Sequence, residues 1–271
     1  MNYDITDLIF SEDKGQVYTS IIEEAIIKHG IWRNQKRLDG YKLERAFHAS
    51  GIGNVCDREL LYQFAKVPSE RKQTTQNMKR LDNGTYVHLR YDEYLKFSEN
   101  YVAMNLHMYD EEHFIQGSFD QIILSKDKLY IVDLKSIKDE NFLKIFGKAP
   151  EGYYAQLQAY IWMMNLNYEQ WKNEDKKFEL EENKKLVELF EKYEKYFPIT
   201  KAILFFEDKD NQLTEEIIID YDEKFIEKLK ERLKSIKKCY NDNTLPDRRM
   251  NDNCKWCNHK KACGRNDLWT K

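Results

Sequence analysis

The stretch YIVDLKS, residues 130–136, decides the fold, because it has the pattern of a buried β-strand that carries two charges. Its apolar positions have the β-branched and aliphatic character of strand core. Asp133 and Lys135 are two positions apart, so both side chains point to the same side of the strand. A solvent-facing edge strand and a catalytic strand both fit this pattern, and the neighbouring segments decide between them.

The preceding segment predicts that this strand is half of a β-hairpin. Residues 114–124, FIQGSFDQIIL, read as a strand and are followed by the polar turn SKDK. If Leu124 faces Leu129, Asp120 lies directly across from Asp133, with Cβ atoms roughly 4.5–5.5 Å apart. Like charges in this position destabilise a sheet. The pair therefore indicates a divalent cation, which binds oxygen ligands and offsets the repulsion.

Two carboxylates and a lysine on one sheet face suit the hydrolysis of a phosphodiester. The carboxylates would hold one or two divalent ions that activate water and stabilise charge on the phosphorus. Lys135 would position or deprotonate the attacking water, or neutralise developing negative charge. The alternative is an ordinary solvent-facing hairpin that carries Asp-x-Lys by chance.

The rest of the chain alternates between helical and strand patterns. Apolar spacing predicts helices at 17–29, 55–66, 76–97, 152–166 and 223–240, a charged surface helix within 168–196, and a second hairpin of 201–208 with 215–222. This order predicts an α/β core with an N-terminal helical elaboration. We expect one domain, made of a mainly helical part (1–110), a core (111–240) and a cysteine-bearing tail (241–271).

Composition supports a folded protein without a membrane segment. The 271 residues are 41% hydrophobic and 14% aromatic, which favours a packed core, and the net charge of −3 does not by itself indicate a nucleic-acid binder. The local basic clusters, read either as solvated faces or as phosphate contacts, are Arg33, Lys36 and Arg37; Arg71, Lys72, Lys79 and Arg80; and Lys255, Lys260, Lys261 and Arg265. The absence of an apolar span and of a signal-peptide pattern predicts a cytoplasmic location.

The cysteines indicate metal ligation. Five cysteines in a chain without a secretion signal argue against disulfides. Cys254, Cys257 and Cys263 form a C-x2-C-x5-C pattern that lacks a fourth ligand. The candidates for that ligand are Cys56, Cys239 and His259. Spacing alone leaves zinc and an iron–sulfur cluster equally open.

Four short motifs follow one another along the chain: Gly84-x-x-x-His88, Gly117-x-x-Asp120, Asp133-x-Lys135 and Gln156-x-x-x-Tyr160. In kind and order they resemble the motifs of the RecB-type branch of the PD-(D/E)XK nucleases. The resemblance implies a restriction-endonuclease-like α/β core, with a mixed central sheet flanked by helices. It departs from the commonest pattern in having Asp rather than Glu before Lys135. Gln158 could compete with Gln156, but it lies off the helix face of Tyr160.

The resemblance also implies a role for each motif residue. The ligands of Mg²⁺ or Mn²⁺ would be His88, Asp120, Asp133 and the carbonyl of Leu134. Lys135 would be the catalytic lysine, and Gln156 and Tyr160 would line the site near the DNA.

The cysteine pattern is similar to that of iron–sulfur nucleases related to the AddB subunit and of the CRISPR-associated exonucleases of spacer acquisition. In those families one cysteine precedes the nuclease motifs and three follow. The segment Cys56-Asp-Arg58, with Tyr62, resembles the start of their first cysteine helix. The resemblance implies a [4Fe–4S] cluster on Cys56, Cys254, Cys257 and Cys263. The cluster would staple the two ends of the chain together and leave Cys239 as a free thiol.

We therefore expect a metal-dependent DNA exonuclease that acts on single-stranded DNA or frayed ends. Recombination and repair, phage DNA processing and CRISPR spacer acquisition all suit such a site, so protein partners and oligomeric state stay open. The alternative is a non-cleaving DNA-end-binding or adaptor subunit. The intact set of His88, Asp120, Asp133 and Lys135 argues against it, because a degenerated site would have lost at least one of them.

Overall fold

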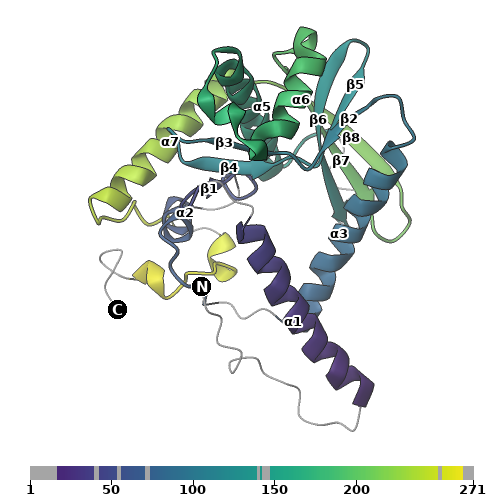
Figure 1. Cartoon of the computed structure of the whole chain (residues 1–271). Helices are drawn as coiled ribbons and strands as arrows, with labels where there is room; N and C mark the ends of the chain where they lie inside the picture. Colours follow the sequence, from purple (N-terminus) through teal and green to yellow (C-terminus); the bar gives the residue numbers. More distant parts are fainter. Residues whose placement is uncertain are drawn as a thin grey trace.

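The computed structural model describes residues 17–39, 43–53, 56–70, 74–138, 141, 147–249 and 252–264 (Figure 1). Parts of the sequence-based expectations fall outside these ranges, namely the N-terminal segment 1–16 and the basic residues Arg71, Lys72 and Arg265. Among the described residues, no helix is both long and apolar enough to cross a bilayer.

The helices lie close to where apolar spacing predicts them. They are α1 (Val17–Asp39), α2 (Asp57–Phe64), α3 (Thr75–Leu95), α5 (Glu151–Lys172), α6 (Lys184–Tyr193) and α7 (Glu223–Asn241). Short 3-10 turns span Lys176–Glu179, Glu181–Asn183, Glu194–Tyr196, Asp252–Lys255 and Ala262–Gly264. The charged segment 168–196 is therefore helical only in part, and its helix α6 buries Leu186, Leu189 and Phe190 rather than lying free on the surface.

Within the described residues, eight strands form two sheets. The strands are β1 (Phe47–His48), β2 (Tyr101–Met104), β3 (His107–Asp110), β4 (Ile115–Ser118), β5 (Gln121–Ser125), β6 (Lys128–Ile137), β7 (Lys201–Asp208) and β8 (Thr214–Asp220). The smaller sheet has the order β1-β4-β3, and the larger has the order β2-β5-β6-β7-β8. In the larger sheet β6 and β7 run parallel and the other neighbours antiparallel, so the expected mixed sheet is confirmed.

The hairpin register predicted from the sequence is confirmed. Leu124 pairs with Leu129 and Gln121 with Val132 along β5 and β6. The two turn residues, Lys126 and Asp127, have φ values of 49° and 56°, which is the left-handed conformation of a type I′ turn. The second predicted hairpin is also present, as β7 and β8.

One expectation about this hairpin was wrong. Residues 114–124 do not form a single strand, because β4 belongs to the smaller sheet and β5 to the larger one. The chain leaves one sheet and enters the other at Phe119 and Asp120. The Phe119 side chain is fully buried there, and the carbonyl of Asp120 accepts a hydrogen bond from the Asn105 amide at 3.0 Å. Asp120 therefore lies in a bend immediately before β5.

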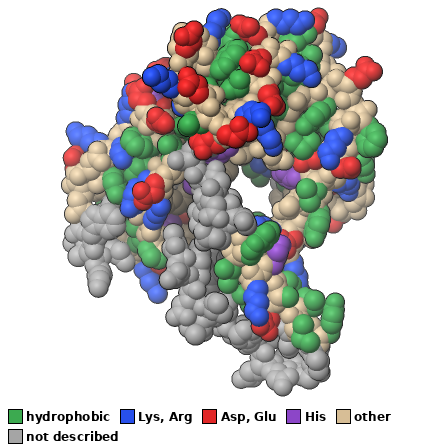
Figure 2. Space-filling model, in the orientation of Figure 1, with side chains coloured by type: hydrophobic (Ala, Val, Ile, Leu, Met, Phe, Trp, Pro, Cys, Tyr) green, Lys and Arg blue, Asp and Glu red, His purple; other side chains and the backbone are tan. Residues whose placement is uncertain are grey.

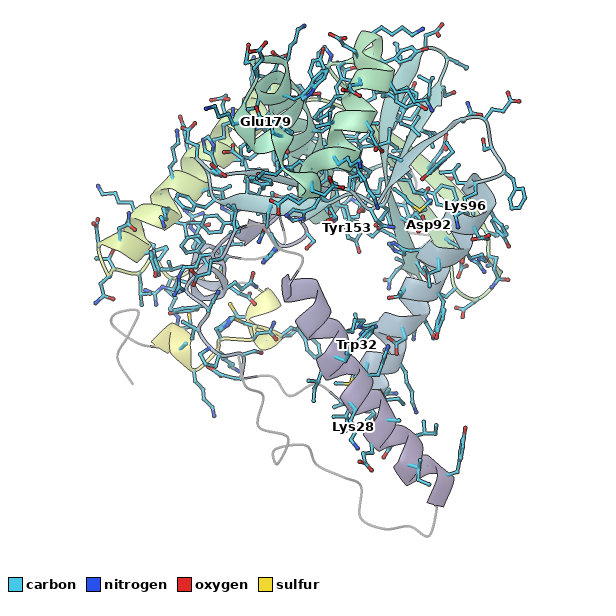
Figure 3. All side chains as sticks on the ribbon, in the orientation of Figure 1. Lys28, Trp32, Asp92, Lys96, Tyr153 and Glu179 are labelled. Atoms are coloured by element: carbon cyan, nitrogen blue, oxygen red, sulfur yellow. The ribbon has the colours of Figure 1, made fainter. Side chains whose placement is uncertain are left out.

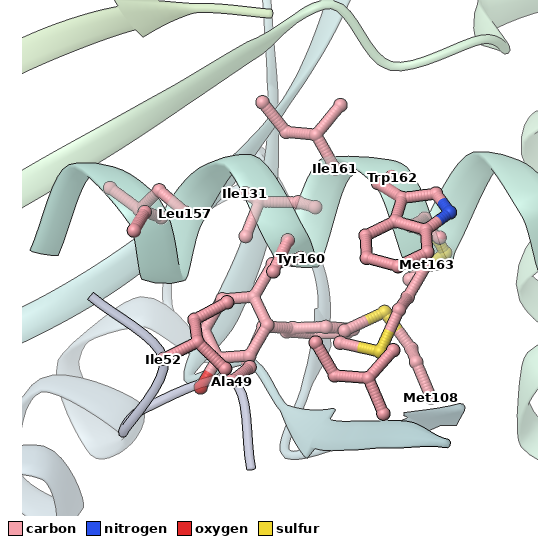
Figure 4. Close-up of a cluster of buried hydrophobic side chains, with 14 of the residues drawn as sticks. Ala49, Ile52, Met108, Ile131, Leu157, Tyr160, Ile161, Trp162 and Met163 are labelled. Atoms are coloured by element: carbon pink, nitrogen blue, oxygen red, sulfur yellow. The ribbon is translucent and has the colours of Figure 1, made fainter. Parts of the chain in front are cut away.

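Helix α5 is the centre of the core. It contacts β6 and β7 of the larger sheet and β3 and β4 of the smaller one. Its buried residues cover most of its circumference, which explains why its sequence is apolar on nearly every face. Figure 4 shows the Tyr160 side chain directed from α5 toward Ile52 and Ala49, with Met163 one turn further along the helix.

Helices α1 and α3 form a pair that extends from the body of the molecule (Figure 1). Arg33 of α1 forms an ion pair with Asp82 of α3, and a Cβ on Gly30 would lie 3.2 Å from the Met78 side chain, which shows how closely the helices approach. The upper part of α3 packs under β6 of the larger sheet. In the space-filling view an opening passes between this pair and the body (Figure 2).

Gly53 occupies a position where a side chain does not fit. A Cβ there would lie 2.6 Å from Gly152 Cα and 2.7 Å from Ala155 Cβ, at the start of α5. We predict that Gly53→Ala lowers the free energy of unfolding by about 1–3 kcal/mol through overpacking, measured by denaturant unfolding. Gly51→Ala is the control, because its Cβ would meet its neighbours at 3.5 and 3.6 Å. Equal effects of the two substitutions would contradict this packing account.

Candidate active site

Strand β6 presents its two charged residues on the face of the sheet that α5 covers. Val132 and Leu134 point to the opposite face, where they pack with Tyr91 of α3. Alternation along the strand therefore turns Asp133 and Lys135 toward α5, as the sequence predicts. Asp133 is only 1% exposed.

Asp120 joins three elements through its carboxylate. Its Oδ2 accepts a hydrogen bond of 2.7 Å from the Leu134 amide of β6. Its Oδ1 lies 3.1 Å from Nδ1 of His88, on α3. Asp120 lies in the bend between β4 and β5 and is not paired with a residue of β6. Its carboxylate can therefore contact both β6 and α3. Leu134 is thus placed beside Asp120 by its amide, and the ligand role expected for its carbonyl stays a prediction.

Asp133 is held from two sides. Gln156 Nε2 of α5 donates to Asp133 Oδ1 at 3.0 Å and lies 2.9 Å from the Tyr160 hydroxyl, so the two motif residues of α5 act together. Lys135 Nζ lies 2.6 Å from Asp133 Oδ2 as an ion pair. The same ammonium group lies 5.0 Å from the centre of the Tyr153 ring.

Burial and charge change the proton affinities of these groups. Burial is the main cause that raises the pKa of Asp133 to about 6; Lys135 opposes the rise, and the negative charge of Asp120 adds to it. Burial lowers the pKa of His88, but the hydrogen bond and charge of Asp120 outweigh it, so that pKa is raised. The pKa of Lys135 is likewise raised, because Asp133 outweighs the effect of burial. The lysine therefore stays charged at neutral pH.

This donor set fits a hard divalent cation. The two carboxylates supply the oxygen ligands that Mg²⁺ and Mn²⁺ prefer, and the imidazole of His88 adds a nitrogen donor beside them. The negative charge of Asp120 contributes to the raised pKa of Asp133. A cation between the two carboxylates would offset that effect.

Gln158, the rival of Gln156, has a structural role instead. Its Nε2 donates to the Asp220 carbonyl at 2.7 Å, and its Oε1 accepts from the Asp222 amide at 2.8 Å. It therefore fixes the connection between β8 and α7, away from the carboxylates.

Of the two motif glycines, Gly84 and Gly117, only Gly117 lies where the structure leaves no room for a side chain. A Cβ at Gly117 would lie 2.9 Å from Tyr160 Cε1 and 3.0 Å from Ala49 Cβ. A side chain there would displace Tyr160, which is hydrogen-bonded to Gln156. A Cβ at Gly84 would meet no atom within 4 Å.

Sequence reasoning missed the buried carboxylate of Asp92. This residue is 6% exposed and lies one turn after His88, on the upper part of α3 (Figure 3). It accepts a hydrogen bond of 2.7 Å from Gln121 and one of 3.3 Å from Asn105. Gln121 follows Asp120 directly in the sequence, and the backbone amide of Asn105 donates to the Asp120 carbonyl. Through these two partners, Asp92 connects the bend at Asp120 to α3, the helix that carries His88. The i, i+4 spacing from His88 is the signal that could have indicated it.

A second buried carboxylate, Glu207 at the end of β7, also escaped the sequence analysis. Tyr91 donates to it at 2.7 Å, and Arg90 pairs with both of its oxygens. Burial and the bond to Glu207 raise the pKa of Tyr91 to about 12. These contacts attach α3 to the sheet on the side opposite α5.

The fold also brings the first cysteine helix against the tail. Cys56 is the N-cap residue of α2. Arg58 donates to the Cys263 carbonyl at 2.8 Å, and Tyr62 donates to the Ala262 carbonyl at 3.0 Å. Segments about 200 residues apart in sequence therefore lie side by side.

The cysteines of this region suit a thiolate-ligated group. Among the described residues, Cys56, Cys254, Cys257 and Cys263 form no disulfide, and all four are half-buried. The pKa of Cys257 is raised to about 11, first by burial and then by Glu59, with a contribution from Cys56. Cys56 therefore lies near enough to Cys257 to affect its pKa. Cys239 packs against the core from α7.

Comparison with known proteins gives the chain its family. Residues 43–264 match the PD-(D/E)XK nuclease superfamily. No curated protein matches the sequence. The solved structure of SSO0001 is similar, with a TM-score of 0.53 and 18% identity over 91% of this chain and 98% of that one, which shows the fold.

Two further solved structures resemble the chain less closely. One is an alkaline exonuclease from Laribacter hongkongensis, with a TM-score of 0.45 and 12% identity over 73% of this chain and 88% of that one. The other is a phage related exonuclease from Haemophilus somnus 129PT, with a TM-score of 0.41 and 16% identity over 74% of this chain and 95% of that one. The family match covers all four motifs and the tail cysteines, and the chain therefore belongs to the PD-(D/E)XK nuclease superfamily.

Proposed function

We propose that the protein is a metal-dependent DNA exonuclease that hydrolyses phosphodiester bonds of single-stranded DNA or of DNA ends. The observation that carries this proposal is the convergence of Asp120, Asp133 and Lys135, with His88 beside them, in a partly exposed site between α3 and α5. The preference for DNA ends comes from the resemblance to RecB-type exonucleases.

Each residue has a role that follows from its contacts. Asp120, Asp133 and His88 would hold Mg²⁺ or Mn²⁺, which supplies a Lewis acid and lowers the pKa of a water molecule. Lys135, charged and 2.6 Å from Asp133, would orient the attacking water or neutralise charge that develops on the phosphate. Gln156 keeps Asp133 in place and, with Tyr160, would border the DNA.

The second candidate, a non-cleaving DNA-end-binding or adaptor subunit, has less support. Such a subunit has no need of a half-buried carboxylate beside a buried one, because the two like charges cost stability unless a cation offsets them. The complete set of motif residues also lies together in the structure. The setting of the nuclease in recombination, repair, phage processing or CRISPR adaptation is left open, as are protein partners and oligomeric state.

We further propose that Cys56, Cys254, Cys257 and Cys263 hold a [4Fe–4S] cluster. The support is the resemblance in spacing and the packing of the first turn of α2 against the tail. A group bound only in the folded state stabilises that state. The cluster would therefore act as a staple that closes the chain around the nuclease core. Free thiols and such a cluster suit a reducing compartment, the cytoplasm.

Replacement of the lysine tests the catalytic proposal. We predict that Lys135→Ala lowers cleavage of end-labelled single-stranded DNA in Mg²⁺ or Mn²⁺ by at least about a hundredfold, while DNA binding in Ca²⁺ is retained. Lys138→Ala removes an exposed lysine three residues further along the same chain and serves as the charge-matched control. Cleavage by Lys135→Ala at the wild-type rate would contradict the assignment, and the 5′- and 3′-labelled products would give the polarity.

The raised pKa of Asp133 predicts a pH dependence of metal binding. The carboxylate must lose its proton to bind a cation, so protons compete below about pH 6. The raised pKa of His88 acts in the same direction. We predict that Mn²⁺ affinity, measured by calorimetry, weakens by about tenfold or more between pH 7 and pH 5. An affinity that is unchanged over this range would contradict the proposed ligands.

The cluster proposal is tested with cysteine variants. After anaerobic reconstitution with iron and sulfide, we expect the wild type and Cys239→Ala to show the broad visible absorbance of a cluster. Cys254→Ala is expected to lack it and to melt at a lower temperature. A wild-type protein that stays colourless after reconstitution would contradict the cluster but would leave the nuclease proposal untouched.

A further inference from the structure

Three side chains at the junction of α2 and the tail have the arrangement of a mononuclear metal site. Glu59 of α2 and Cys257 and His259 of the tail each present a ligand atom, and these atoms all lie within 4.8 Å of one another. Glu59 and His259 are buried, at 8% and 3% exposure. These residues are distinct from the acidic site on β5 and β6, and two of the three have no place among the proposed cluster ligands.

The imidazole of His259 is prepared to act as a ligand. Its Nε2 lies 3.1 Å from the Val67 carbonyl and can only donate to that oxygen, so in the neutral ring Nδ1 carries the lone pair. That Nδ1 atom is buried and has no hydrogen-bond partner in the described part of the chain. A buried nitrogen without a partner costs free energy. A bond from the other ring nitrogen to a carbonyl is the usual way in which a protein orients a metal-binding histidine.

The remaining two ligands are held in place around this lone pair. The Glu59 carboxylate accepts from the Asn258 amide at 3.5 Å, and Cys257 Sγ accepts from the His259 amide at 3.4 Å. Among the described residues, no lysine or arginine forms an ion pair with Glu59. The carboxylate is therefore available to a cation.

We infer that Glu59, Cys257 and His259 bind a single zinc ion in protein that lacks the cluster. Thiolate, imidazole and carboxylate together suit Zn²⁺, which accepts sulfur, nitrogen and oxygen ligands in one tetrahedral site. Zinc–ligand distances of about 2.0–2.3 Å require ligand atoms roughly 3.3–3.8 Å apart. Small side-chain rotations close that gap from the observed spacing. The fourth position would be taken by water or a further thiolate.

The zinc site and the cluster exclude each other, because both use Cys257. Zinc on these residues would hold the tail against α2 when no cluster has been assembled. Metal binding that requires the folded arrangement stabilises it. The inference is independent of the nuclease proposal, since it concerns no residue of the acidic site.

Co²⁺ is the probe that separates the two kinds of occupancy. Full-length protein that has been freed of metal is titrated with Co²⁺, whose thiolate charge-transfer absorbance reports ligation by cysteine, and Zn²⁺ is then added to displace it. We expect the thiolate absorbance to saturate with one equivalent of Co²⁺ and to disappear when one equivalent of Zn²⁺ displaces it. Wild-type protein loaded with the cluster is expected to show no thiolate–Co²⁺ absorbance, since any Co²⁺ in the acidic site has no thiolate ligand.

Variants assign the ligands. His259→Ala and Glu59→Gln are expected to weaken Co²⁺ and Zn²⁺ binding at least tenfold while still assembling the cluster, which also shows that their tails are folded. Cys254→Ala is expected to lose the cluster but to keep zinc affinity within a fewfold of wild type, and Cys257→Ala to lose both. If His259→Ala and Glu59→Gln bind Co²⁺ as tightly as wild type, the zinc site is overturned. If they lose the cluster as well, the two sites are not separable and the inference also fails.

Discussion

The buried carboxylate of Asp133 is the constraint around which the centre of the molecule is arranged. An ionised group that is 1% exposed is costly unless it is paired and hydrogen-bonded. Lys135 supplies the pairing at 2.6 Å and Gln156 the hydrogen bond at 3.0 Å, while Asp120 adds repulsion rather than relief. Under the proposed function, a cation held between Asp120 and Asp133 would offset this repulsion. The surrounding helices α3 and α5 serve to hold these groups at fixed positions.

The geometry of the central hairpin could be predicted because its causes are local. A two-residue turn and the pairing of Leu124 with Leu129 set the register, and the register places every later side chain. The break at Phe119 and Asp120 could not be predicted in this way. Its causes are the burial of Phe119 and the hydrogen bond from Asn105, and both arise only after the two sheets have formed.

The supporting carboxylates were hidden for a similar reason. Asp92 and Glu207 stand in charged segments where acids are ordinary surface residues. Their structural roles depend on partners far along the chain. Asp92 accepts a hydrogen bond from Gln121, 29 residues away, and Glu207 pairs with Arg90, 117 residues away. The motif resemblance indicated His88 but carried no information on what holds its helix. The extent of the predicted single domain likewise stays a prediction, since the structure describes only part of residues 1–45.

The most direct test of the account is the position of a bound metal ion. Crystals soaked in Mn²⁺ at neutral pH would give an anomalous scattering peak at the ion. The account predicts a peak about 2.0–2.6 Å from carboxylate oxygens of both Asp120 and Asp133. A peak at another position, or carboxylates that stay free of Mn²⁺ at saturating concentration, would contradict it.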